Sequence, residues 1–313
     1  EWYNVNDSNL GMKFRRESFP GSTTFPFPGA GGTAPGIRDI ASEANLTNER
    51  TTWSVTSTLN VQLNDNFSVK SITNYRDVDI FLRQDLDFSS NINDDVQDLT
   101  ITSEQFSQEL QLIYESERLH GLAAIYYFNE DLFGSNRIHF DDSVPTGSPP
   151  NLVNLGPPAV LVPAPPLENG GSFNEFNPSL GLEWRPLDRM LLFFTYSQGF
   201  KSGVIQTGQL IPITEPELID NYEFGLKSTL FDRRLRLNVS GFFYEITDLQ
   251  VRRTQPVPGG GFETLFENAA AAEGHGVEVE STWLVTDNFT LGGFLSYLNA
   301  EFTEFDTDNP LDI

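Results

Sequence analysis

Several cationic and aromatic side chains of this sequence are of types that bind small ligands without covalent chemistry. The cations stand near the predicted ends of alternating segments, where long connections begin; they are Arg76, Arg83, Lys201 and Arg252. There they could contact an anionic chelate, or they could simply pair with carboxylates of the same connections. The aromatic candidates belong to the connections themselves and could stack on a chelate or a sugar; they are Phe133, Phe140, Phe262 and Phe266.

Patterns for catalysis or metal binding are sparse. Cysteine is absent, which excludes thiolate nucleophiles and disulfide scaffolds. His139 lies near Asp141 and Asp142 in a long connection, but a hydrated loop explains this trio better than a metal site. His275 stands between two glycines, and the start of a strand explains this position better than a metal ligand does. The sequence contains no Gly-x-Ser-x-Gly elbow, the turn that carries a nucleophilic serine. We therefore expect no catalytic residue, no metal site and no cofactor.

The charge balance is strongly acidic. The chain has 19 Lys and Arg against 44 Asp and Glu, a formal net charge of −25. Nucleic acid is excluded as a partner, because phosphate contacts require clustered basic side chains. The stretch after Arg83 holds five aspartates and no basic residue before Thr102. It could attract a cationic ligand or a hard cation such as calcium, although an acidic loop that keeps an exterior hydrated is the simpler interpretation.

Alternation of apolar and polar residues is the dominant pattern. From Thr52 to Leu63 the odd positions read Trp, Val, Ser, Leu, Val, Leu, whereas the even positions are all polar and uncharged. The same alternation returns in segments 106–112, 180–185, 222–227, 234–239 and 277–280. Each segment predicts a strand with one face turned to an apolar medium. No apolar run approaches the ~18 residues of a membrane-spanning helix.

Two kinds of connection join these strands. Five are tight and polar and predict hairpin turns at 64–66, 115–118, 185–189, 231–234 and 286–288. The others are long and run over 83–102, 131–172, 200–215 and 251–273. We therefore expect ten strands in five hairpins, with every tight turn at the same end. This asymmetry is typical of outer-membrane barrels, and strands of about a dozen residues cover the ~9–11 that a tilted strand needs to cross a bilayer.

Aromatic residues recur eight apart on one face of four strands. The pairs are Phe67 with Tyr75, Phe106 with Tyr114, Phe176 with Trp184, and Phe289 with Tyr297. Eight residues span about 26 Å of strand, which approaches the height of an apolar band flanked by two aromatic girdles. The segments 123–128 and 191–194 are apolar on both faces. Their inner face would meet protein, such as a plug in a large lumen, or they belong to a closed soluble core.

The segment from Phe193 to Gly203 resembles a strand end of the TonB-dependent outer-membrane receptors, which carry a Tyr-Ser-x-Gly-Phe-Lys-x-Gly stretch. Other segments are similar to further strands of that family in the same order. They are 71–76, 106–110, 216–227, the strand that ends Thr247-Asp248-Leu249-Gln250, Glu267-Asn268-Ala269, and 274–280. The resemblance covers about residues 51 to 303.

This resemblance implies an all-β, antiparallel, up-and-down transmembrane barrel, here partial, with about ten strands and long extracellular loops. We expect residues 1–50 to be a long loop or leading segment, 51–303 the partial barrel, and 304–313 a truncated loop. The family surrounds an N-terminal plug with 22 strands. We see neither the plug, nor the TonB-contacting motif, nor the closing strand, so we expect a fragment of the barrel.

The implied function is active import across the bacterial cell outer membrane, without covalent chemistry and hence without enzyme activity. The expected partners are membrane lipid and lipopolysaccharide, TonB through the plug, and a small ligand such as a ferric siderophore. Cobalamin and oligosaccharides are alternative ligands. A passive porin or adhesin with the same wall is an alternative function, and so is a soluble extracellular β enzyme or carbohydrate-binding protein, in which the odd face of 53–63 would be buried.

Overall fold

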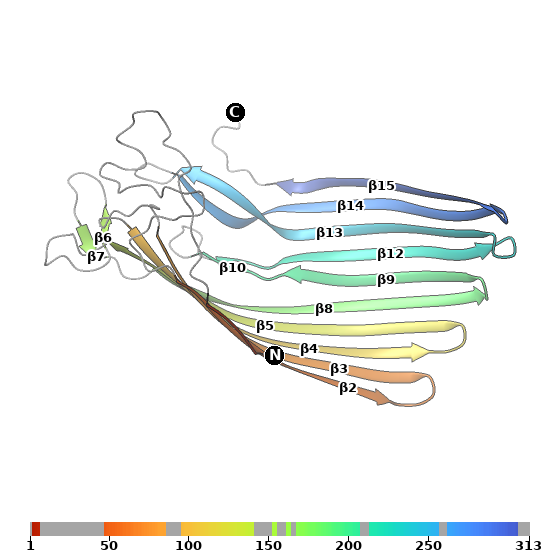
Figure 1. Ribbon diagram of the computed structural model, residues 1–313, viewed down its shortest axis with the longest axis horizontal. Helices are drawn as coiled ribbons and strands as arrows, with labels where there is room; N and C mark the ends of the chain where they lie inside the picture. Colours follow the sequence, from red (N-terminus) through yellow and green to blue (C-terminus); the bar gives the residue numbers. More distant parts are fainter. Residues whose placement is uncertain are drawn as a thin grey trace.

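The computed structural model describes residues 2–6, 47–85, 95–140, 152–154, 161–163, 167–206, 213–256 and 262–305. They form one large antiparallel sheet and two small hairpins (Figure 1). The sheet contains, in spatial order, β1 (Trp2–Asn6), β2 (Thr47–Gln62), β3 (Phe67–Asp85), β4 (Asp95–Glu115), β5 (Leu119–Phe140), β8 (Leu167–Leu187), β9 (Met190–Lys201), β12 (Glu217–Leu230), β13 (Leu235–Pro256), β14 (Phe262–Thr286) and β15 (Phe289–Phe305). The small hairpins are β6 (Leu152–Asn154) with β7 (Leu161–Pro163), and β10 (Val204–Ile205) with β11 (Ile213–Thr214). None of the described residues belongs to a helix long and apolar enough to cross a membrane.

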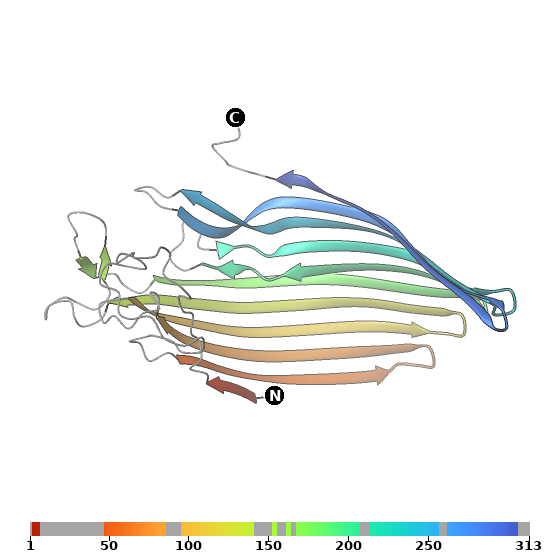
Figure 2. The same ribbon diagram turned by 45° about the horizontal axis from the view of Figure 1, so that its top comes forward.

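The ten long strands follow one another in space as they do along the chain. All five predicted tight turns join neighbouring strands at one end, so the strand ends that lead into the longer connections lie at the other (Figures 1 and 2). The predicted fold class, an antiparallel up-and-down wall of about ten strands, is confirmed. The wall is open, since within the described ranges β15 pairs only with β14, and β1 only with β2.

One face of this sheet, which we call the outer face, is apolar and uncovered. Val55, Leu59, Phe224 and Leu295 project from it and are each 60–67% exposed. Alternation places the polar residues between them on the opposite, inner face. In a closed soluble core these side chains would be buried against a second layer. The described strands supply no such layer, which favours a membrane wall over a closed soluble core.

Aromatic rings form a row across the outer face toward the long-connection end. Ring centroids lie 5.2 Å apart for Trp53 and Tyr75, 4.7 Å for Tyr127 and Phe176, and 4.9 Å for Tyr196 and Tyr222. Near the tight turns, Phe67 and Tyr114 are 4.9 Å apart. The eight-residue spacing paired Phe67 with Tyr75 and Tyr114 with Phe106. Tyr75 and Phe106 are indeed cross-strand partners, and they belong to the row toward the long-connection end. The two levels match the girdles that the spacing predicts.

The strands run farther toward the long-connection end than the sequence predicts. Phe133 and Phe266, expected in loops, lie within β5 and β14, while Phe140 ends β5 and Phe262 begins β14. Alternation is required only where one face meets lipid and the other water. Beyond the bilayer both faces of the sheet contact water. The hydrogen bonds between the strands therefore continue although the alternation of apolar and polar residues has ended.

The hairpin of β13 and β14 is irregular where it leaves the regular wall. The register shifts between Ile246 and Gln250, and Asp248 adopts a positive φ of 53°. A bulge of this kind increases the local twist, and beyond it the two strands cross and turn upward (Figure 1). Residues 249–256 and 262–270 of this hairpin thereby approach the small β10–β11 hairpin, which lies between β9 and β12 in the chain.

Candidate functional site

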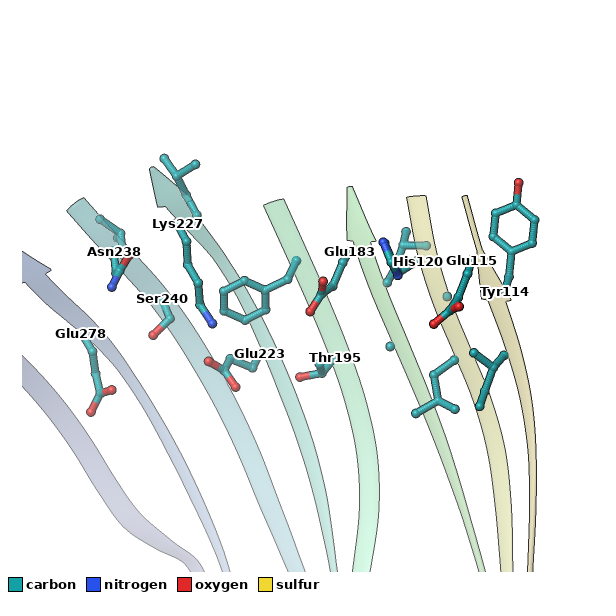
Figure 3. A pocket seen from close by; sticks show the side chains of 18 of the residues that line it. Tyr114, Glu115, His120, Glu183, Thr195, Glu223, Lys227, Asn238, Ser240 and Glu278 are labelled. Atoms are coloured by element: carbon teal, nitrogen blue, oxygen red, sulfur yellow. The ribbon is translucent and has the colours of Figure 1, made fainter. Parts of the chain in front are cut away.

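The inner face carries a hollow of about 1020 Å³ toward the tight-turn end (Figure 3). Five carboxylates line it, from Glu115, Glu183, Glu223, Glu278 and Glu280. Its one lysine, Lys227, lies with Nζ 5.1 Å from the ring centroid of Phe193. The hollow therefore presents acceptors and negative charge to whatever occupies it. No three metal-ligating side chains converge there or elsewhere in the described ranges.

Aromatic rings on the inner wall lie over glycines of the neighbouring strands. A Cβ added at Gly225 would lie 2.4 Å from the ring of Phe193, and one at Gly276 would lie 2.5 Å from Phe242. Gly274 is covered in the same way by Tyr244. His275, which we expected at a strand entrance, instead lies within β14. Its flanking glycines are required because these two rings occupy the space of a side chain.

The long-connection end of the inner face, which we call the mouth, contains a buried carboxylate. Glu130 of β5 is only 6% exposed. It accepts hydrogen bonds from Ser103 Oγ at 2.7 Å, Gln105 Nε2 at 2.8 Å and Ser202 Oγ at 2.6 Å. Ser202 directly follows β9, so Glu130 fixes the start of the connection to β12 against the inner wall.

Apolar packing continues this attachment on β8. Phe173 is 3% exposed, and its ring occupies the space beside Gly203, where a Cβ would approach to 2.1 Å. A Cβ at Gly171 would lie 3.7 Å from Ile205 and 3.6 Å from Ile213. The β10–β11 hairpin thus rests on the inner face of β8.

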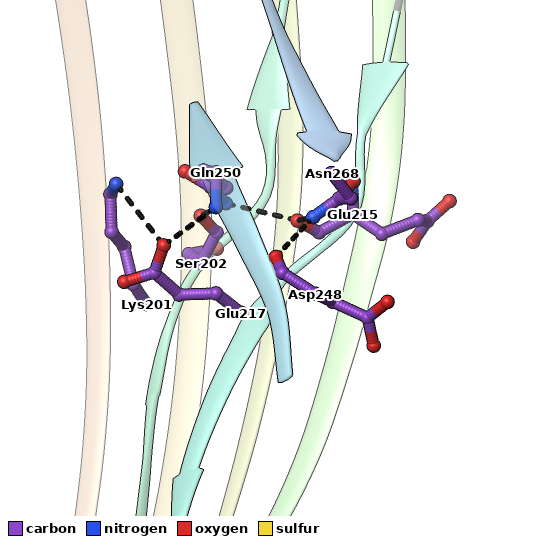
Figure 4. Close-up of polar contacts among 7 residues, drawn as sticks. All are labelled: Lys201, Ser202, Glu215, Glu217, Asp248, Gln250 and Asn268. Carbon is purple, nitrogen blue, oxygen red and sulfur yellow. Dashed lines mark hydrogen bonds and ion pairs between the residues drawn. The ribbon is translucent and has the colours of Figure 1, made fainter. Parts of the chain in front are cut away.

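Two carboxamides attach the same connection to the β13–β14 hairpin (Figure 4). Gln250 Nε2 donates to the carbonyl oxygens of Ser202 and Glu215, both at 2.9 Å. Asn268 Nδ2 donates to the carbonyl oxygen of Glu215 at 2.9 Å and to that of Asp248, in the bulge, at 2.7 Å. Asn268 Oδ1 also accepts from the Glu215 amide at 2.8 Å. These side chains take the place of a strand ladder.

A third carboxamide, Gln206, pairs with the backbone of β14. Its Nε2 donates to the Phe266 carbonyl at 2.7 Å, and its Oε1 accepts from the Phe266 amide at 2.6 Å. Thr214 Oγ1 donates to the same carbonyl at 2.8 Å. Gln206 is 8% exposed and Thr214 is 1% exposed, so these bonds are shielded from water.

The structure disperses the eight predicted ligand candidates. Arg76, expected near a long connection, lies in the middle of β3, because that strand continues to Asp85. Alternation places it on the inner face, whereas Arg83 and Phe133 lie on the outer face. Arg83 is held by Asp98 through two hydrogen bonds of 2.6 Å, which raise the pKa of its guanidinium.

The remaining candidates gather near the mouth. Lys201 Nζ lies 3.6 Å from Glu217, and Arg252 faces Phe266 across the β13–β14 ladder, where both are exposed. The side chains of Phe140 and Phe262 lie outside the described residues. Of the candidates, Phe266 takes part in the carboxamide network through its backbone alone, and Lys201 reaches the network through Glu217, which accepts from the Gln250 amide. Among the residues that hold the connection, Gln250 and Asn268 belong to segments that resemble the receptor family in sequence. Gln206 and Glu130 belong to no such segment, so the sequence alone did not indicate them.

Comparison with known proteins relates the C-terminal part of this chain to a family and its sheet to solved structures. The model of the TonB dependent receptor-like β-barrel matches residues 162–313. The FrpB iron transporter from Neisseria meningitidis, in its F3-3 variant, is similar over 84% of this chain and 37% of that one, at 16% identity with a TM-score of 0.53. The F5-1 variant, in its apoprotein form, aligns over 82% and 37% at 16% identity with a TM-score of 0.54.

The ferric yersiniabactin uptake receptor FyuA from Yersinia pestis aligns over 82% of this chain and 44% of that one, at 16% identity with a TM-score of 0.48. The chain therefore spans less than half the length of these solved proteins. At such identities the FrpB structures establish the fold alone. The family match shows that residues 162–313 belong to the β-barrel of the TonB-dependent receptors, a family of bacterial outer-membrane transport proteins, and the FrpB structures show that the rest of the described wall continues the same fold.

Proposed function

We propose that this chain forms part of the wall of a receptor that imports a scarce small ligand with energy delivered by TonB. The observation that supports this proposal most strongly is the contrast between the two faces of the sheet. The outer face is apolar and crossed by aromatic rows, whereas the inner face is polar, charged and hollow. Such a contrast suits a barrel wall between lipid and an occupied lumen. Outer-membrane lipid and lipopolysaccharide would then contact the outer face.

TonB would act through a plug domain inside the lumen. The acidic hollow supports this arrangement, since its five carboxylates outnumber its single lysine and would accept hydrogen bonds from a polar surface of the plug. The rings of Phe193, Phe242 and Tyr244, which lie over glycines, leave the inner surface smooth. The import of ligand would follow from rearrangement of that plug rather than from chemistry on the wall.

We infer that the ligand is a ferric siderophore. The FrpB neighbour is described as an iron transporter, and an inner-face cation offers a contact for an anionic ferric chelate. That cation is Arg76, whose side chain makes no hydrogen bond or ion pair within the part of the chain that the structure describes. Arg252 and Phe266, exposed beside the mouth, are further candidates.

Uptake of radioactive iron tests this function in cells that produce the full receptor. Ferric chelate uptake should require both the receptor gene and TonB. Arg76→Ala should raise the KM for uptake several-fold with little change in maximal rate, because it removes a binding contact rather than a gating step. Lys70→Ala is the matched control, since Lys70 lies on the same strand and face nearer the tight turns.

Uptake that persists without TonB would instead indicate a passive pore. Binding of cobalamin or an oligosaccharide, with no binding of ferric chelates, would replace the ligand and leave the receptor class intact. Equal effects of Arg76→Ala and Lys70→Ala would remove Arg76 from the ligand path.

A further inference from the structure

We propose that residues 202–206 and 213–216, which lie between β9 and β12, form a fixed shelf inside the mouth. It does not close over a ligand; it permanently narrows the ligand path on the side of β8 to β14. This inference concerns the mouth itself and does not depend on which ligand is imported.

The shelf bridges parts of the wall that are well separated. Three strands, β9, β12 and β13, stand between β8 and β14 in the sheet. Four interstrand spacings of ~4.8 Å make this separation about 19 Å along the wall. The connection nevertheless contacts β8 through Gly171 and Phe173, and β14 through Phe266 and Asn268. It therefore crosses the inner side of the wall where β9 ends and β12 begins.

Polar contacts at both ends of the shelf are specific and shielded. On one side the buried Glu130 carboxylate accepts from Ser202. On the other, the Gln206 carboxamide satisfies both backbone groups of Phe266, as a neighbouring strand would. Opening the shelf would break these bonds together, and a buried carboxamide or carbonyl without a partner is costly. The opened state is therefore sparsely populated.

Apolar packing reinforces these polar contacts of Ser202 and Gln206, which we call the clamp. Leu265 and Thr214 are fully buried in this region, and Phe173 is nearly so. Elsewhere the described wall is a single layer in which most side chains are exposed or half-buried. A loop that must move in a binding cycle is expected to have few buried contacts and exposed backbone bonds. This connection has the opposite properties.

Cysteine labelling measures whether the shelf opens. The 313 residues contain no cysteine, so Thr214→Cys adds a single thiol to this region of the full receptor in intact cells. A membrane-impermeant maleimide should label it at least about tenfold more slowly than Glu215→Cys, because Thr214 is buried and its neighbour Glu215 is exposed. Adding Gln206→Leu should accelerate labelling of the Thr214→Cys receptor by roughly tenfold, since the clamp to Phe266 is lost.

Equal labelling rates at positions 214 and 215 would overturn the fixed shelf. A disulfide provides a second measurement should Thr214→Cys fail to fold. The pair Gly171→Cys and Ile205→Cys should cross-link in the membrane, because a Cβ at Gly171 would lie 3.7 Å from Cγ2 of Ile205, near the position that a cysteine sulfur at 205 can take. Iron-chelate uptake should then be the same before and after reduction of the cross-link.

Loss of uptake on cross-linking, restored by dithiothreitol, would show that the connection must move and would overturn the shelf. Absence of uptake in the unmodified receptor would instead contradict the proposed ligand. In that case the labelling rates still decide the shelf, so the two failures are distinguishable.

Discussion

At the scale of single residues, the inner wall depends on glycines that face aromatic rings. A Cβ at Gly225 would lie 2.4 Å from Phe193 and 2.7 Å from the carbonyl oxygen of Val239. Gly225→Ala should therefore lower the free energy of unfolding of the receptor by about 1–3 kcal/mol, measured by denaturant titration in detergent. Gly292→Ala is the control, since its nearest neighbour would be 3.9 Å away. Equal effects would mean that the ring does not occupy this space.

A second residue-scale prediction separates the two faces. Leu59 projects from the outer face and is 60% exposed, whereas its neighbour Thr58 projects from the inner face. Leu59→Arg should destabilise the folded receptor in lipid vesicles by about 2–4 kcal/mol, because the charge would enter the hydrocarbon near the midplane. Thr58→Arg should cost much less, since it would enter a polar lumen. A larger cost at Thr58 would reverse our assignment of the faces.

At the scale of elements, the tight turns are linked in series by ion pairs. An arginine of one turn reaches an aspartate of the next, as Arg118 reaches Asp188 at 3.3 Å and Arg189 reaches Asp232 at 3.3 Å. Asp188→Ala should leave the unfolding midpoint unchanged, because this aspartate is almost fully exposed. Arg118→Ala should lower the midpoint measurably, since its guanidinium also donates to two carbonyl oxygens of the neighbouring turn. The opposite ranking would show that charge, rather than these backbone bonds, links the turns.

The same elements show what the sequence could predict. Alternation and turn chemistry located ten strands and five turns, because lipid on one face imposes a period of two wherever a strand crosses it. The outer parts of β5 and β14 escaped prediction because no medium imposes that period there, so Phe133 and Phe266 were placed in loops. The clamp could not be foreseen either. Gln206 recognises the backbone of Phe266, sixty positions away, and a backbone partner leaves no pattern in the side chains.

At the scale of the whole molecule, the wall has two free edges. Within the described residues β15 is paired on one side only, and all of its residues are exposed. Backbone groups along such an edge would meet hydrocarbon without partners, which bilayers do not tolerate. The wall is therefore stable in a membrane only when further strands cover both edges.

The 313 residues produced alone should consequently self-associate in detergent, although circular dichroism should still show mainly β-structure. The full receptor should be monomeric and migrate differently on gels before and after heating. Light scattering of both proteins in the same detergent measures the difference. A monomeric, heat-modifiable 313-residue protein would contradict the open wall, because it would require the edges of β1–β2 and β15 to pair with each other into a smaller barrel. Such closure would force a different stagger on strands whose present registers are continuous from β2 to β5.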